Sequence, residues 1–421
     1  MYSCTKLKSG LQVATAEVPH MASSCVGLWV NVGGRHESKD ENGAAHFIEH
    51  MLFKGTPSRD ARQISEEVEG LGGYLNAFTA EENTCYYAKA SSEHSDKLID
   101  VLFDMFLNAT FQPEEVRKER AVILEENAMY LDQPHQLVLE KMNELLWPRH
   151  PMGRSITGTT QSLRRLKREE LLRFRKQHYT AANVLLAGAG NITHKELVKR
   201  ARQLANKLPS GKPAPFERVQ RLNDRFNFRF IPRQVEQAQL AICFKTCSRH
   251  DRRQYALQVL NTLLGENMSS RLFQVLREQH GLAYNVYSNL GSFADGGTLT
   301  IAVGLDPNNV GRAIKLIDHE LKQLRSTPPT KEEVDRAAQY LNGQLDLHLE
   351  NTENHMIWIG EQTLGFGNIR SADSIKSKIR AVTPKAIQSV ATDFFQRKTS
   401  RIALVGPKAK GIDPPADFLV E

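Results

Sequence analysis

Long apolar runs are missing from this sequence. None of its 421 residues lies in a stretch near the roughly 18 consecutive apolar residues that a membrane helix requires, and the longest runs are as short as residues 184–189. The first eight residues also lack a basic start followed by an apolar core, and they do not form an Arg-rich amphipathic presequence. We therefore predict a soluble protein without an export signal.

Cysteine is scarce as well. The chain has five cysteines, an odd number and few for its length, so a disulfide-stapled miniprotein is excluded. They are Cys4, Cys25, Cys85, Cys243 and Cys247. Free thiols suit a reducing compartment, and we expect a cytoplasmic location.

An excess of acidic residues is also absent, since the formal net charge is +7. A basic chain raises the possibility of nucleic-acid binding. The densest basic stretch, residues 164–176, nevertheless interleaves its bases with leucines and with Glu169 and Glu170, as on the solvated face of a helix. We expect no nucleic-acid partner and no membrane partner.

The length allows two or three domains, and breakers mark one clear boundary. Residues 208–215 hold three prolines and a glycine close to the midpoint of the chain. We predict an N-terminal domain over 1–208, a linker over 209–217 and a C-terminal domain over 218–421. Both halves mix strand-like runs with amphipathic helical segments, so each is a mixed α/β domain.

The two halves also resemble each other. Residues 113–116, which open one long helical pattern, are similar to residues 331–334, which open another. Residues 96–102 are likewise similar to residues 311–317. The same order and a similar offset favour an internal duplication.

The most informative string is residues 42–55, a helical pattern with start residues and a terminal glycine. On that helix His46 and His50 are i and i+4, so both imidazoles can bind one Zn²⁺, and Glu49 flanks the same site. A glutamate beside the metal can act as the general base for water. The motif alone leaves a second interpretation open, in which two partly buried histidines and a surface acid lie on an amphipathic helix.

A catalytic zinc site needs a third protein ligand. In the helical pattern over 113–130, Glu119 and Glu126 share one face at ~100° per residue, and Val122 and Ile123 lie on that face as well. An inward carboxylate needs a partner, so Glu126 is our ligand candidate and Glu119 the acid that orients a histidine or the ligand. Glu125 falls on another face and is better explained as a surface glutamate.

These residues resemble the signature of the inverted zinc peptidases, the pitrilysin, insulin-degrading enzyme and mitochondrial processing peptidase family. That signature is H-x-x-E-H, a ligand glutamate 76 residues later and an acid seven residues before it, which match His46 to His50, Glu126 and Glu119. The resemblance covers nearly the whole chain and indicates a single-chain, two-domain bacterial-type member. It implies a metalloendopeptidase with one zinc ion per chain, Glu49 as the catalytic base and Glu119 as a catalytic-site acid.

The resemblance also implies a fold and a substrate site. The expected class is α+β, with two homologous domains, each a largely antiparallel sheet packed with helices. Residues 72–79 look like the family's edge strand, to which an extended peptide adds as a further strand. Asn76, Ala77 and Phe78 would then bind the substrate. Without the resemblance, an ordinary glycine-led strand would be the better interpretation.

The second half shows no zinc motif of its own, because residues 256–260 stand in register with His46–His50. Residues 269–284 resemble the family segment that supplies an arginine and a tyrosine seven residues apart, here Arg277 and Tyr284. The resemblance implies that these two donate hydrogen bonds as an oxyanion forms. Cys243, Cys247 and a nearby histidine lack a fourth ligand and a shared strand face, so we do not expect a second zinc site there.

The resemblance further implies partners. Short or unfolded peptides are the expected substrates, and family members enclose them in cavities built from four such domains, so a chain with both residue sets points to a homodimer. A heterodimer stays open. The alternative is a noncatalytic or processing subunit of a heteromeric assembly that cleaves leader peptides. Acidic residues that could bind basic presequences are Glu66, Glu67, Glu69, Glu81 and Glu82.

Overall fold

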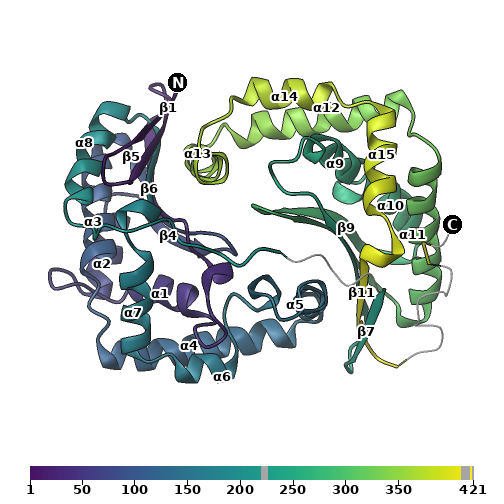
Figure 1. Cartoon of the computed structure of the whole chain (residues 1–421), viewed down its shortest axis with the longest axis horizontal. Coiled ribbons are helices and arrows are strands. Elements are labelled where there is room, and N and C mark those ends of the chain that lie inside the picture. The colour runs from purple at the N-terminus through teal and green to yellow at the C-terminus, as the bar shows by residue number, and fades with distance from the viewer. Residues whose placement is uncertain (220–225, 409–417, 420–421) are drawn as a thin grey trace. The chain divides into compact units, whose positions relative to one another are not determined.

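The structure is a computed structural model that describes residues 1–219, 226–408 and 418–419 (Figure 1). Contacts between residues divide the chain into two compact units. The first unit comprises residues 1–128, 154–217 and 346–371, and the second comprises residues 129–153, 218–345 and 372–421. The change from residue 217 to 218 follows the expected linker, but each unit also takes a segment from the other half of the sequence.

The first unit contains a six-stranded sheet in the order β1-β2-β6-β3-β5-β4. Its strands are β1 (Tyr2–Lys6), β2 (Gln12–Glu17), β3 (Ser23–Val30), β4 (Tyr74–Thr79), β5 (Thr84–Ser91) and β6 (Val184–Gly190). Only β2 and β6 pair in parallel within this sheet. The strand order places β4 at one edge of the sheet.

The second unit contains a five-stranded sheet in the order β7-β11-β8-β10-β9. Its strands are β7 (Asn227–Pro232), β8 (Ala238–Thr246), β9 (Ala283–Ser292), β10 (Gly297–Leu305) and β11 (Ser400–Gly406). The last strand, β11, pairs in parallel with β7 and antiparallel with β8, as β6 does with β2 and β3. The five strands of this sheet thus repeat the order β2-β6-β3-β5-β4, which confirms the predicted α+β fold with two homologous, largely antiparallel sheets.

Helices surround both sheets. Those of the first unit are α1 (Ala44–Leu52), α2 (Ala61–Glu69), α3 (Ser95–Asn108), α6 (Thr160–Arg165), α7 (Arg168–His178), α8 (His194–Ala205) and α13 (Thr352–Phe366), with most of α4 (Pro113–Asp132). Those of the second unit are α5 (Pro134–Leu146), α9 (Gln254–Asn261), α10 (Arg271–Phe273), α11 (Val310–Ser326), α14 (Ala372–Arg380) and α15 (Pro384–Phe394), with most of α12 (Lys331–His348).

Each sheet is covered by one helix from the other half of the sequence (Figure 1). The helix α13 packs on β2, β3 and β6, and α5 packs on β8 and β11. The contact of α13 is so close that a Cβ on Gly360 would lie 2.4 Å from the ring of Trp29, and one on Gly27 would lie 2.4 Å from Met356 Sδ. Glycine at both positions lets this helix approach the sheet.

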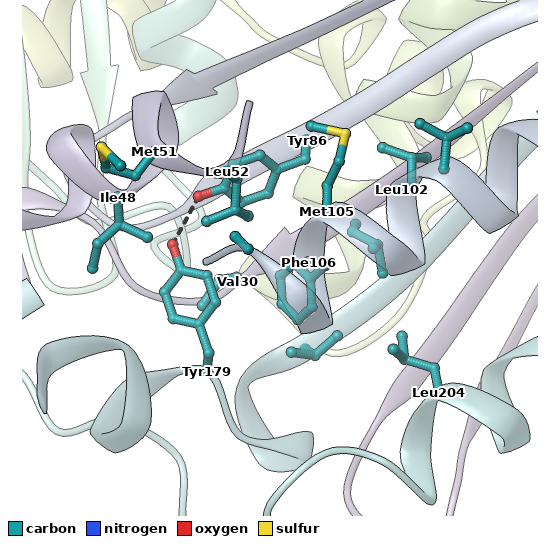
Figure 2. Close-up of a cluster of buried hydrophobic side chains, with 14 of the residues drawn as sticks. Val30, Ile48, Met51, Leu52, Tyr86, Leu102, Met105, Phe106, Tyr179 and Leu204 are labelled. Atoms are coloured by element: carbon teal, nitrogen blue, oxygen red, sulfur yellow. Dashed lines mark hydrogen bonds between the residues drawn. The ribbon is translucent and has the colours of Figure 1, made fainter. Parts of the chain in front are cut away.

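The apolar face of α1 fixes that helix in the core of the first unit. Figure 2 shows Ile48, Met51 and Leu52 of α1 among side chains from β3, β5 and α3. Tyr86 and Tyr179 share a hydrogen bond of 2.8 Å in the same cluster, which satisfies both buried hydroxyls. Burial of these side chains leaves the other face of α1 for His46, Glu49 and His50.

The predicted elements lie close to those observed, with two differences. The amphipathic segment that begins at Gln254 is α-helical only as far as Asn261 and continues as a π-helical turn over Thr262–Glu266. The placement of Val122 on the inward face of α4 was wrong, because its side chain is 50% exposed while Ile123 is fully buried. Val122 lies three positions after Glu119 on α4, and positions three apart on a helix differ by about 60° in direction. This difference is enough to leave Val122 outside the buried face that contains Glu119.

Part of the basic stretch serves the fold of the first unit. Arg175 donates to the carbonyls of Phe106 and Leu107 at the end of α3, and Arg168 donates to the carbonyl of Phe111. The last carbonyls of a helix have no partner within it, so Arg175 stabilises the end of α3, while Arg168 holds the segment that follows it. Among the described residues, no helix is long and apolar enough to cross a membrane.

Candidate metal centre

The three predicted ligands come together in the first unit. The helix α1 carries His46 and His50, and α4 carries Glu126. Glu126 Oε2 lies 3.9 Å from His46 Nε2 and 3.6 Å from His50 Nε2. Among the described residues, this is the one group of three or more His, Cys, Asp or Glu side chains whose ligand atoms lie within 4.8 Å of one another.

The donor set and its spacing fit zinc. Tetrahedral Zn²⁺ with bonds of about 2.0–2.1 Å places its ligand atoms roughly 3.4 Å apart, close to the two distances measured here. Two imidazole nitrogens and one carboxylate oxygen are a known catalytic zinc set that leaves a fourth position for water. Burial, with the nearby His50, lowers the pKa of His46 to about 3, so its ring is neutral and able to bind a metal at ordinary pH.

A carboxylate orients the second histidine. Glu119 Oε1 lies 2.9 Å from His50 Nδ1, and Lys54 Nζ lies 2.8 Å from Glu119 Oε2. Burial acts to raise the pKa of Glu119, but the hydrogen bonds from His50 and Lys54 outweigh burial and hold it below its usual range. An ionised Glu119 accepts a hydrogen bond from the Nδ1–H of His50 and leaves Nε2 unprotonated and facing Glu126.

Glu49 lies next to this group and is held by the edge strand. Thr79 Oγ1, at the end of β4, donates to Glu49 Oε2 at 2.5 Å. Burial raises the pKa of Glu49, the carboxylate of Glu126 adds to the rise, and the Thr79 hydrogen bond and His50 oppose it. A raised pKa suits a group that must accept a proton and return it near neutral pH.

The three predicted substrate residues lie on β4, which pairs with β5 alone among the described strands. Asn76 is exposed, and its side-chain oxygen accepts the N–H of Ala77 at 2.8 Å. The ring of Phe78 packs edge-on against Trp29 at 5.4 Å, so this side chain supports the strand from the core side. An unpaired edge strand is a template for a further strand.

Arg277 and Tyr284 come together in the second unit. Arg277 Nη1 donates to the carbonyl oxygen of Tyr284 at 3.0 Å, and its guanidinium lies 5.2 Å from the centre of the Tyr284 ring. The side chain of Tyr284, at the start of β9, is 76% exposed. The structure therefore presents an exposed tyrosine whose main-chain carbonyl and ring are contacted by a neighbouring guanidinium.

Sequence reasoning missed Thr79 and Lys54. Thr79 belongs to the strand that was predicted, but its contact with Glu49 spans 30 positions and depends on how β4 passes α1. Lys54 follows α1 and reaches Glu119 on α4. The one signal for Lys54 was that the expected buried acid, Glu119, needs a cationic partner. No local sequence pattern indicated the role of Thr79.

Proteins with similar sequences identify the family to which this chain belongs. A Streptomyces coelicolor protein named as an uncharacterized zinc protease is 37% identical over 96% of this chain and 89% of its own length. A Bacillus subtilis protein of the same name is 34% identical over 96% of this chain and 98% of its own. The family model described as "Insulinase (Peptidase family M16)" matches residues 12–160, and "Peptidase M16 inactive domain" matches residues 165–341. The chain belongs to peptidase family M16.

The M16 fold is also found in solved structures. A protease from Helicobacter pylori superposes with a TM-score of 0.91 at 21% identity, covering 97% of this chain and 99% of that one. A Pseudomonas fluorescens structure described as a peptidase M16 inactive domain gives 0.89 at 19% identity, covering 97% and 98%. The family model that matches residues 12–160 contains every residue of the candidate metal centre, and the model that matches residues 165–341 contains Arg277 and Tyr284. The predicted family membership is confirmed.

Proposed function

We propose that this M16 chain is a zinc-dependent endopeptidase that hydrolyses short or unfolded peptides. The observation that carries the proposal is the convergence of His46, His50 and Glu126 on one point, with Glu49 beside them. The relatives named as zinc proteases support the choice of metal. Zinc held by these three residues would act as a Lewis acid and lower the pKa of a bound water toward ~7.

The residues of the chain supply the proton transfers and the geometry. Glu49 takes the proton of the attacking water and returns it to the leaving amine, and its raised pKa suits both steps. Thr79 holds one oxygen of Glu49, which leaves the other for the water. Glu119 keeps the Nδ1 proton on His50 and so keeps Nε2 available as a ligand.

The substrate would bind as an added strand on β4. The N–H of Ala77 is now satisfied by the side chain of Asn76, an interaction that a peptide carbonyl can replace at little cost. Because Thr79 at the end of β4 also holds Glu49, a peptide on this edge would follow the strand toward the base. Main-chain pairing would allow many peptide sequences to bind, with Asn76, Ala77 and Phe78 as the contacts on β4.

Arg277 and Tyr284 are proposed to donate hydrogen bonds to the substrate carbonyl as its oxygen gains charge, the role that the family resemblance implies. The open hydroxyl of Tyr284 and the guanidinium beside it support this role. Since one chain carries both this pair and the ligand set, a homodimer is the proposed assembly. Light scattering on active enzyme should give twice the chain mass of 47.5 kDa, and a mass of 47.5 kDa would contradict it.

Three of the five acidic residues named for a leader-peptide processing subunit already pair with cations of the chain. Glu67 pairs with Arg59 and Lys97, Glu66 pairs with Arg62, and Glu82 pairs with the buried Arg35. Glu67 and Glu82 would have to exchange cations of their own chain for those of a basic presequence. A general peptidase is the better proposal, and a reducing compartment suits the free cysteines.

The test is Glu49→Gln, which keeps the size of the side chain and removes the base. We expect zinc content to stay at one per chain and turnover of an unstructured peptide library to fall by at least ~10²-fold. Glu125→Gln, an exposed glutamate on α4, is the control and should keep full turnover. Undiminished metal-dependent cleavage by Glu49→Gln would refute the mechanism.

A further inference from the structure

The two histidines of the metal centre are held in different ways. His50 is oriented through its own ring, since Nδ1 lies 2.9 Å from Glu119. His46 Nδ1 is buried and has no hydrogen-bond partner among the described residues. The ring of His46 therefore depends on the backbone of α1 and on packing for its direction, and the position of the start of that helix becomes decisive.

A buried carboxylate holds the start of α1. Glu37, 2% exposed, accepts the N–H of Gly43 through Oε2 and the N–H of Ala45 through Oε1, both at 2.8 Å. Its Oε2 also accepts from Asn42 Nδ2 at 3.2 Å. The first N–H groups of a helix lack partners within it and form its positive end, so a carboxylate there both bonds and complements them. Ala45 directly precedes His46.

The same end of α1 is tied to α4 through a loop at Gly158. Gly43 has a φ of 93°, and a Cβ on it would lie 2.9 Å from Gly158 Cα. A Cβ on Gly158 would lie 2.8 Å from the carbonyl oxygen of Asn42. The carbonyl of Gly158 in turn accepts Asn127 Nδ2 at 2.8 Å. Asn127 is buried and directly follows Glu126.

These contacts form a continuous chain from the residue before His46 to the residue after Glu126. We propose that Glu37 and Asn127 are positioning residues that set the spacing of these two ligands, acting through Gly43 and Gly158. The proposal rests on the metal site of the proposed function. A zinc site tolerates only about 0.2 Å of error in its bond lengths, so a shift of the start of α1 against α4 would weaken binding.

The test uses Glu37→Gln, which keeps the shape but replaces one acceptor oxygen with a donor that faces a backbone N–H. We expect Zn²⁺ affinity, measured by chelator competition, to fall by about 10–100-fold, the range for residues that orient ligands. The visible absorption of the Co²⁺-loaded protein should change, because that spectrum reports the geometry of the ligands. Asn127→Ala acts from the other end of the chain of contacts and should change both readouts in the same direction.

Glu17→Gln is the matched control. Glu17 Oε1 accepts the N–H of His194 at 2.7 Å, so it holds the start of α8 in the same unit, a helix without ligands. This variant should keep wild-type Zn²⁺ affinity and Co²⁺ spectrum even where its thermal midpoint falls.

Three results would overturn the proposal. One is wild-type Zn²⁺ affinity and spectrum in folded Glu37→Gln, or in Asn127→Ala if Glu37→Gln does not fold. Another is an equal loss of affinity in Glu17→Gln, since the effect would then be general destabilisation. The third, failure of the wild-type chain to bind Zn²⁺ at all, would remove the proposed function together with this inference.

Discussion

The two units share a strand order but not a chemistry. In the first, the inward positions of α1 and α4 carry His46, Glu119 and Glu126. In the second, the stretch in register with His46–His50 is residues 256–260, which are apolar except for Gln258. When α4 and α12 are aligned by their first residues, Glu119 corresponds to Ala337. Ala337 is buried without any charge to satisfy. The same arrangement of strands and helices therefore carries a candidate metal centre in one unit and an ordinary core in the other, depending on a few inward side chains.

The second unit still contributes donors in our proposal, and removing one should have the largest effect. Tyr284→Phe deletes a hydroxyl that would donate to the developing oxyanion, so we expect kcat for peptide cleavage to fall by about 10²-fold with zinc content unchanged. Steady-state kinetics with metal analysis measures both. Tyr287→Phe on the same strand is the control. If Tyr284→Phe cleaves at the wild-type rate, the second unit has no such role.

The second unit has no charge at the position equivalent to Glu119, so removing the charge of Glu119 should weaken metal binding in the first unit. Glu119→Gln removes the charge that holds His50 and Lys54, and we expect Zn²⁺ affinity to fall by about 10–100-fold. Chelator competition gives the affinity, and Glu125→Gln on the exposed side of α4 should match wild type. Equal affinity in both variants would show that Glu119 does not orient the ligand.

The comparison also predicts a pH dependence for the metal-free protein. The folded pKa of His46 is about 3, against about 6.5 for an ordinary histidine, chiefly because of burial. Below pH 6.5 the imidazole of His46 binds a proton in the unfolded chain but not in the folded chain. The contribution of His46 to the free energy of unfolding is therefore fully present above pH 6.5 and is lost as the pH falls toward 3. Urea unfolding in a chelator should give a lower stability at pH 5 than at pH 7. His46→Gln should shrink that difference, whereas the exposed His135→Gln should leave it as it is.

The smallest effect concerns the helix that covers the first sheet. Gly360→Ala places a Cβ against Trp29 and should destabilise the protein by about 1–3 kcal/mol. Gly343→Ala on α12 meets nothing within 4 Å and should stabilise by up to about 1 kcal/mol. Denaturant unfolding compares the two. Similar behaviour of both variants would mean that α13 does not depend on this close contact.

The sequence predicted the ligands because their spacing is local or follows one helix face, as with His46 and His50 on α1. It also located two pairs of helical segments that repeat between the halves, in α4 and α12 and in α3 and α11. It could not predict that α5 and α13 each cover the other half's sheet, because an amphipathic helix does not specify its partner. Thr79, Lys54 and Glu37 were missed for the same reason, since each acts through a contact made only in the folded chain.

The most direct test of the whole account is the number of zinc ions per chain, measured by native mass spectrometry. The wild-type chain should bind one, and Glu126→Gln and His50→Ala should each bind none under the same conditions. A second tightly bound zinc, or one zinc retained in both variants, would contradict the claim that His46, His50 and Glu126 in the first unit form the metal centre of this M16 chain.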